Sequence, residues 1–341
     1  MTIQERKKDH VDLTVNSDVS YEKTTGFEQY DFVHNALPEV NPEDIDLDAT
    51  FLGRRFSFPL FISSMTGGYT EAGPVNAIIA KCCEKLNLPF GVGSQRAMLE
   101  DPGLTDTFSV VRDLAPTAFI AANIGGAQLI GNLKDKKIGM LVKSIEADAI
   151  IVHLNPLQEL MQPEGDHNFK GIEKGIIHLV ANTDCPVIVK ETGAGISGEA
   201  ARRLLSIGVN AIDVAGAGGT SWARVENLRP EKKNPRHQFN NWGIPTVQSL
   251  TEVNKLRNEF HYSLIASGGI RSPFDIVKSI ALGADFTAVA QPVIKTVVEK
   301  GEEGLLQLIE EWKESTKMIL TLLGCSHFKE LGMQHLRRSY K

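Results

Sequence analysis

Eight short apolar segments recur along the chain, and each is followed by glycine or polar residues and then by a longer segment. The longer segments, such as 199–208 and 273–284, place apolar residues three and four positions apart, as amphipathic helices do. Continuous apolar runs that alternate with helices predict buried parallel strands. The runs cover residues 58–66, 89–94, 117–125, 149–155, 186–192, 211–217, 263–269 and 286–292.

This alternation predicts an α/β fold, a closed (β/α)8 TIM barrel, because eight strand–helix units fit the size of such a barrel. The alternative is an open doubly wound sheet, but that fold carries its glycine-rich turn after the first strand, and the glycine clusters here come late. We expect residues 1–57 to form an N-terminal arm that closes over the barrel mouth. Residues 58–341 should form the barrel, with a long C-terminal helix over 301–324.

Composition limits the partners. The formal net charge of the 341 residues is -6, so no broad basic face is expected for nucleic acid, and an anionic ligand needs a local group of cations. No stretch of 18 apolar residues occurs and the N-terminus has no apolar signal segment, which predicts a cytoplasmic protein without a membrane partner. The four cysteines lack CxxC spacing, which argues against structural zinc and predicts reduced thiols.

Polar residues follow all eight predicted strands. Because TIM barrels place their chemistry at the carboxyl ends of the strands, these residues are expected to meet in one site. Strand-end capping explains a single Ser or Asn equally well, but it does not explain the recurrence at every strand. The candidates are Ser64, Met65, Thr66, Ser94, Gln95, Arg96, Asn123, His153, Asn155, Gln158, Glu159, Lys190, Thr220, Gly269, Ile270, Arg271, Ala290 and Gln291.

Three of these features indicate a particular chemistry. The glycine-rich turns 216–220 and 267–273 follow late strands, where barrels commonly bind phosphate through backbone N–H groups, so a phosphate-bearing cofactor is expected. Lys190 is either a Schiff-base nucleophile or a positive charge beside an electron-accepting ring. The basic cluster 6–10 is either a solvated tail or a set of cations that meets a diphosphate together with Arg96.

Motifs spread over nearly the whole chain resemble the type 2 isopentenyl-diphosphate isomerases. The segments HLNPLQE and GSQR are the specific ones, whereas SGGIR is shared with many FMN-binding barrels. The matching segments are RKKDH (6–10), MTGG (65–68), GSQR (93–96), NIG (123–125), HLNPLQE (153–159), VKETGAGIS (189–197), AGAGGTSW (215–222), WGIPT (242–246) and SGGIRSPFDIVKSIALGA (267–284).

The resemblance implies an FMN-binding barrel that interconverts isopentenyl diphosphate and dimethylallyl diphosphate through reduced FMN, with Mg2+ and NAD(P)H required. It implies a homo-oligomer of four or more subunits. Gln158 and His153 would be catalytic, and Glu159 would bind Mg2+. The isoprenoid diphosphate would be held by Arg6, Lys7, His10, Ser94, Gln95, Arg96, Asn155 and Gln158. FMN would be held by Ser64, Met65, Thr66, Ser94, Asn123, Lys190, Thr220, Gly269, Ile270, Arg271, Ala290 and Gln291.

Three rival functions are weighed against this one. An FMN-dependent 2-hydroxy acid oxidase needs a histidine base in the turn where this chain has Ala217. A relative of inosine-monophosphate dehydrogenase needs a nucleophilic cysteine after the sixth strand, and residues 217–246 contain none. A flavin-binding sensor without catalytic activity is compatible with the composition, but it leaves Gln158 and Glu159 without a role.

Overall fold

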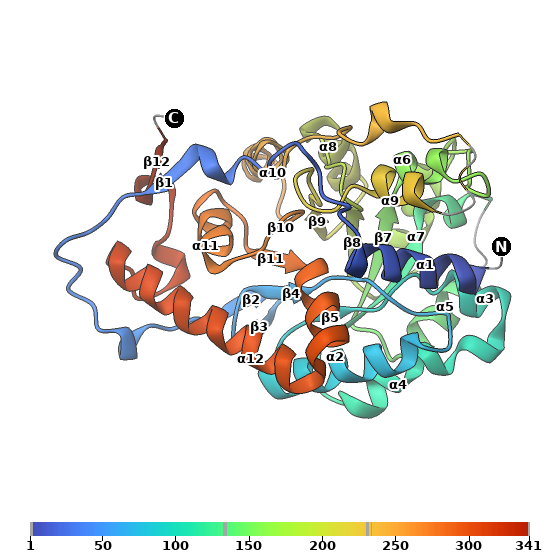
Figure 1. Ribbon diagram of the computed structural model, residues 1–341, viewed down its shortest axis with the longest axis horizontal. Helices are drawn as coiled ribbons and strands as arrows, with labels where there is room; N and C mark the ends of the chain where they lie inside the picture. Colours follow the sequence, from blue (N-terminus) through green and yellow to red (C-terminus); the bar gives the residue numbers. More distant parts are fainter. Residues whose placement is uncertain (1–2, 132–134, 230–231, 233, 340–341) are drawn as a thin grey trace.

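The core of the computed structural model, which describes residues 3–131, 135–229, 232 and 234–339, is a closed barrel of eight parallel strands. The predicted (β/α)8 fold is therefore confirmed, and every barrel strand lies within one of the predicted apolar runs (Figure 1). The strands are β4 (Leu60–Ile62), β5 (Phe90–Gly91), β6 (Ile120–Gly125), β7 (Ala149–Leu154), β8 (Val187–Glu191), β9 (Ala211–Asp213), β10 (Ser263–Ser267) and β11 (Phe286–Val289).

Amphipathic helices cover the outside of the barrel, and their buried faces complete the main apolar core with the outward side chains of the strands. They are α2 (Ala72–Leu86), α4 (Asp106–Leu114), α5 (Asp135–Ser144), α7 (Ile172–Ala181), α8 (Gly198–Ser206), α10 (Thr246–Asn254), α11 (Pro273–Ala281) and α12 (Gln291–Leu323). The predicted C-terminal helix corresponds to the second part of α12, because Gly301 interrupts that helix with φ 65 and ψ -154. No helix among the described residues is long and apolar enough to cross a membrane.

The described residues 3–57 of the N-terminal segment lie at both ends of the barrel. Helix α1 (Ile3–Asn16) lies across the mouth, where it contacts α12 and the short helix α9 (Trp222–Leu228) (Figure 1). Strand β1 (Tyr30–Phe32) instead pairs with the C-terminal strand β12 (Leu336–Arg338). The hairpin of β2 (Ala49–Phe51) and β3 (Arg54–Phe56) closes the opposite end.

That hairpin plugs the barrel with aromatic side chains. Phe51 and Phe56 are fully buried and pack against Phe61, Phe119 and Phe286, which point inward from the barrel wall. Ring centroids in this cluster lie 5.2 to 6.4 Å apart, mostly in edge-on arrangements that aromatic quadrupoles favour. The lower half of the barrel is therefore a solid apolar core, and polar chemistry is confined to the mouth.

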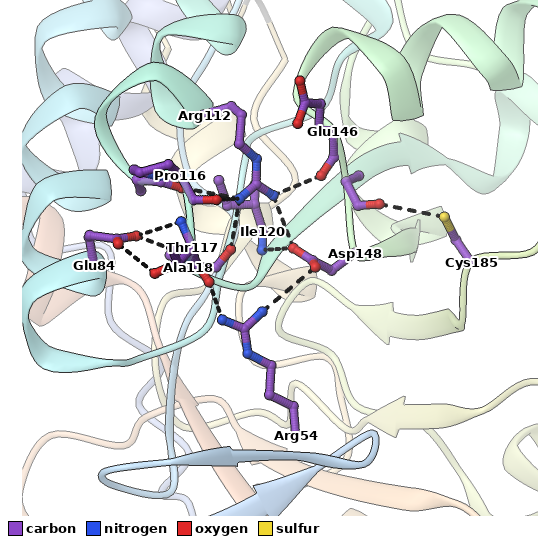
Figure 2. A network of polar contacts seen from close by, with 12 residues as sticks. Arg54, Glu84, Arg112, Pro116, Thr117, Ala118, Ile120, Glu146, Asp148 and Cys185 are labelled. Atoms are coloured by element: carbon purple, nitrogen blue, oxygen red, sulfur yellow. Dashed lines mark hydrogen bonds and ion pairs between the residues drawn. The ribbon is translucent and has the colours of Figure 1, made fainter.

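A polar network fastens the same closed end. Arg112 donates to backbone carbonyls around the turn before β6 and to the Asp148 carboxylate, and Asp148 also accepts from Ile120 N at 2.8 Å (Figure 2). The arrangement recurs four strands later, where Arg257 meets Asp285 at 2.6 Å and Asp285 accepts from Leu264 N at 2.8 Å. Each arginine thus fixes one pair of neighbouring strands, β6 with β7 and β10 with β11.

Candidate active site

A cleft opens at the carboxyl ends of the barrel strands, beneath α1. Every candidate residue named from the sequence lines it except Gln95. Gln95 is fully buried and points into the wall, where its amide nitrogen donates to Leu141 O and Ser144 Oγ and its oxygen accepts from Asn123 N. Its side chain joins β5 to α5 and β6 and does not reach the cleft.

The glycine-rich turns form one wall of the cleft because they touch each other. A Cβ on Gly268 would lie 2.0 Å from Gly216 O, and one on Gly219 would lie 2.5 Å from Gly269 N. Gly268 and Gly269 also have φ values of +95 and +74, which favour glycine. The chain therefore exposes backbone here with no side chain in the way, as a bound phosphate requires.

Lys190 lies on the barrel axis side of β8, in register with His153 on β7 and Asp213 on β9. Its side chain is buried, and Nζ donates to Glu191 O at 2.5 Å. Burial raises the pKa of Asp213, and the charge of Lys190 opposes that shift. On the other side of the cleft the buried Ser64 Oγ has no hydrogen-bond partner among the described residues, so it is a polar group available to a ligand.

His153 is a neutral hydrogen-bonding group. Burial, with the nearby charges of Lys190 and Lys7, lowers its pKa to about 3. His153 Nδ1 lies 2.7 Å from Asn123 Oδ1, and an amide oxygen only accepts, so Nδ1 carries the proton and Nε2 is left as an acceptor. At neutral pH this imidazole orients a ligand by hydrogen bonding and carries no positive charge.

Arg6, Lys7 and His10 of α1 line the cleft, whereas Lys8 is exposed and pairs with Glu71. Lys7 Nζ donates to Ser94 O at 2.8 Å and to Gly67 O at 2.5 Å. Burial, and then the neighbouring cation Arg6, lower the pKa of Lys7 to about 7. An anion that enters the cleft would stabilise the charged form of such an amine, so Lys7 and Arg96 are the cations that could hold one. Backbone and carboxylate partners hold both side chains in place.

Glu159 is a buried carboxylate on the short helix α6 (Pro156–Met161), at the end of β7. Oε1 accepts from Asn155 Nδ2 at 3.0 Å and Oε2 from Asp166 N at 2.7 Å. Gln158 lies beside it, also buried, with Nε2 3.4 Å from Glu226 Oε1. No group of three or more His, Cys, Asp or Glu among the described residues could hold a metal, so a cation at Glu159 would need ligand oxygens from a substrate or water.

Several residues of the site were missed by scanning strand ends. The most important is Glu226 on α9, which does not line the cleft itself but contacts residues that do; its side chain is 1% exposed and its Oε1 lies 2.8 Å from His10 Nε2. Burial alone would raise the pKa of Glu226, but His10, Arg229 and Gln162 together lower it to about 2. Polar or aromatic residues that line the cleft and were missed in the same way are Tyr69, Gln128, Gln162 and Trp222.

Comparison with known proteins identifies the family. A family model described as FMN-dependent dehydrogenase matches residues 2–101 and 154–338. Curated relatives called isopentenyl-diphosphate delta-isomerase are 44% identical in Chlorobium limicola (97% of this chain, 95% of that protein) and 41% in Pyrococcus furiosus (96% and 84%). The chain belongs to the isopentenyl-diphosphate delta-isomerase family.

Solved structures show how this family relates to other flavin barrels. A flavocytochrome b2 mutant matches with a TM-score of 0.70 at 19% identity, covering 96% of this chain and 82% of that one. A mandelate oxidase mutant matches with a TM-score of 0.64 at 17% identity, covering 96% and 95%. Identities this low show a common barrel fold and nothing about the reaction of the isomerase family.

The residues fit the cofactor named by the family model. The phosphate of FMN needs accessible backbone N–H groups, and the two touching glycine turns offer backbone without side chains. The polar edge of the flavin ring needs hydrogen-bonding and charged groups, and Ser64 Oγ and the Lys190 cation provide them. The remaining predicted FMN contacts line the same cleft, and among them Met65, Thr66 and Gln291 follow the neighbouring strands β4 and β11. The chain thus has the donors, the charge and the opening that FMN requires.

Proposed function

We propose that this protein interconverts isopentenyl diphosphate and dimethylallyl diphosphate, and that it requires reduced FMN, Mg2+ and a nicotinamide reductant. The observation that carries the proposal is the polar composition of the cleft. Cations on α1 and after β5 face one carboxylate, Glu159, while the groups between them, Asn123, His153, Asn155 and Gln158, are neutral. Such a site grips an anion without offering a nucleophile.

The reaction moves a double bond, so one carbon of an alkene gains a proton and a carbon two positions away loses one. Reduced FMN, when bound, supplies the group that carries the proton. The protein then has to orient a small apolar substrate by its diphosphate and to exclude water, which is a positioning task. Lys7, Arg96 and the neutral His153 suit the diphosphate, and Glu159 supplies the hard oxygen that Mg2+ prefers.

Lys190 is assigned to the FMN ring. Its positive charge there favours the anionic form of reduced FMN and opposes dissociation of the cofactor. A 2-hydroxy acid oxidase activity lacks support, because the turn that would carry its histidine base has the buried Ala217. A homo-oligomer of four or more subunits is also proposed. Its support is a set of exposed apolar side chains, among them Phe274, Met318 and Leu322, which are 54%, 65% and 50% exposed.

The decisive experiment is an isomerase assay on purified protein with FMN oxidised and reduced in parallel, using NADH, NADPH or dithionite, with and without Mg2+. Product should form only with reduced FMN and Mg2+. Lys190→Ala should lose FMN on gel filtration and lose activity, whereas Lys295→Ala, an exposed lysine on α12, should retain both. A colourless protein that isomerises the substrate without flavin would refute the proposal.

A further inference from the structure

The segment 162–167 follows α6 and lies behind the anion-binding end of the cleft. Its fixed position has local causes. A Cβ on Gly165 would lie 2.0 Å from Glu159 O, so the segment approaches α6 this closely only with glycine there. His167 Nε2 lies 3.0 Å from Glu159 O and 3.1 Å from Gln162 O, which fastens the segment to the end of the helix.

Asp166, between these two residues, is not a lining residue of the cleft, yet it contacts three residues that are. Its Oδ2 accepts from Arg96 Nη1 at 2.8 Å and from Gln128 Nε2 at 2.7 Å. Its backbone N–H donates to Glu159 Oε2 at 2.7 Å. These partners follow β5, β6 and β7, so one residue behind the wall connects the groups offered by three successive strands.

The three partners belong to different parts of the anion site. Arg96 is a cation for phosphate oxygens, and among the described lining residues Glu159 is the one carboxylate, which suits a metal. A diphosphate with a bound divalent cation can meet both at once, one phosphate on the guanidinium and the other through the metal on the carboxylate. A single phosphate can bind at Arg96 alone, so the position of Arg96 relative to Glu159 matters most for a ligand that meets both.

We propose that Asp166 is the positioning residue that fixes Arg96 relative to Glu159 and so makes the cleft favour a metal-bound diphosphate over a monophosphate. The inference rests on the proposed function, which places the diphosphate and Mg2+ at this end of the cleft. Asp166 acts through Arg96, Gln128 and Glu159 and touches no substrate itself. Its loss should therefore weaken diphosphate binding and leave the flavin end of the cleft unchanged.

Glu100 provides a matched control. It also holds Arg96, with Oε1 2.7 Å from Nε, but within the described part of the chain it makes no contact with Gln128 or Glu159. If Asp166 only balanced the charge of Arg96, removing either carboxylate would have the same effect. If Asp166 fixes Arg96 relative to Glu159, only its removal should change how the metal and the diphosphate bind together.

The test is calorimetric titration of inorganic pyrophosphate, and separately of orthophosphate, into FMN-loaded protein with and without Mg2+. Asp166→Ala should weaken Mg2+-dependent pyrophosphate binding about tenfold, the scale of one charge-assisted hydrogen bond. Its orthophosphate affinity should stay within about twofold. Glu100→Ala should lose much less, and Asp166→Asn, which keeps an acceptor oxygen, should be intermediate. In isomerase assays Asp166→Ala should raise KM with little change in kcat.

The outcomes separate the two proposals. A wild-type protein that isomerises its substrate while Asp166→Ala keeps wild-type pyrophosphate affinity would overturn the role of Asp166 alone, and so would an equal loss in Glu100→Ala or for orthophosphate. A wild-type protein that forms no product and binds no pyrophosphate with Mg2+ would overturn both. FMN absorbance and the melting temperature report whether Asp166→Ala is folded. If it is not, the pyrophosphate titration of Asp166→Asn decides whether Asp166 has the proposed role.

Discussion

Replacing Arg112 with methionine should destabilise the protein because it releases the turn between α4 and β6. Methionine has a similar length and is apolar, so the substitution removes the donors without leaving a large cavity. The five N–H groups of the guanidinium face six acceptors, three of which share Nη1. They are the carbonyls of Ala115 (3.1 Å), Pro116 (3.2 Å), Ala118 (3.0 Å), Ile145 (3.1 Å) and Glu146 (2.7 Å) and Asp148 Oδ2 (3.0 Å).

The loss in the free energy of unfolding depends on which partners of Arg112 are shielded from solvent. The bonds to Pro116 and Glu146 are exposed, so water can replace them at little cost. Those to Ala115, Ala118 and Ile145 are partly buried, and each unmade bond costs about 1 kcal/mol. We therefore expect Arg112→Met to lower the free energy of unfolding by about 3–4 kcal/mol. Arg112→Lys keeps the charge and three donors and should cost about 1–2 kcal/mol.

Urea unfolding followed by circular dichroism and tryptophan fluorescence measures this change, provided both signals give one transition with an unchanged slope. Arg257→Met is the matched control, because Arg257 occupies the corresponding place before β10 but its side chain is 34% exposed against 14% for Arg112. It should cost about half as much. The reasoning is refuted if the free energy of unfolding of Arg112→Met lies within about 0.5 kcal/mol of the wild-type value, or if Arg257→Met lowers it more than Arg112→Met does.

Three further results are expected. Phe51→Ala should cost about 3–5 kcal/mol in urea unfolding because it leaves a cavity in the barrel plug, and a cost below about 1 kcal/mol would contradict the packing. The pKa of Glu226 is about 2 in the fold and 4.5 ordinarily, so its ionised form contributes about 3 kcal/mol to the free energy of unfolding above pH 4.5, and this is lost as the pH falls toward 2. Glu226→Gln should flatten the dependence of the free energy of unfolding on pH in this range, and an unchanged pH profile would contradict the assignment. Gly268→Ala should abolish FMN retention, measured by absorbance after gel filtration, and a fully yellow variant would argue against the touching glycine turns.

The barrel and most of its mouth could be predicted because strand ends are local features. An apolar run followed by a polar residue, as at His153 or Lys190, places that residue at the mouth whatever the rest of the chain does. Gln95 shows the limit of this rule, since its neighbours Ser94 and Arg96 line the cleft while its own side chain turns into the wall. Which way a residue after a strand points depends on the short helix that follows, and spacing alone does not give it.

Residues whose role comes from distant partners could not be found from the sequence. Glu226 lies in the middle of a helix, and its significance appears only when α1 brings His10 to 2.8 Å from it. Asp166 lies in an irregular segment, with two of its partners 70 and 38 positions away. The hairpin at 49–56 carries Phe51 and Phe56, but its place at the closed end depends on a cavity that only the assembled barrel forms.

The repeated arginine–aspartate pairs bear on the order in which the barrel folds. Arg112 and Asp148 are 36 positions apart and Arg257 and Asp285 are 28 apart, whereas the bond from Thr287 to Pro59 that seals the barrel spans 228. Joining the wider pair costs about 1.6 kcal/mol more chain entropy than joining Arg112 to Asp148. Each strand pair can thus assemble early around its own arginine, and the seam between the first and last strands then closes on two partly built halves.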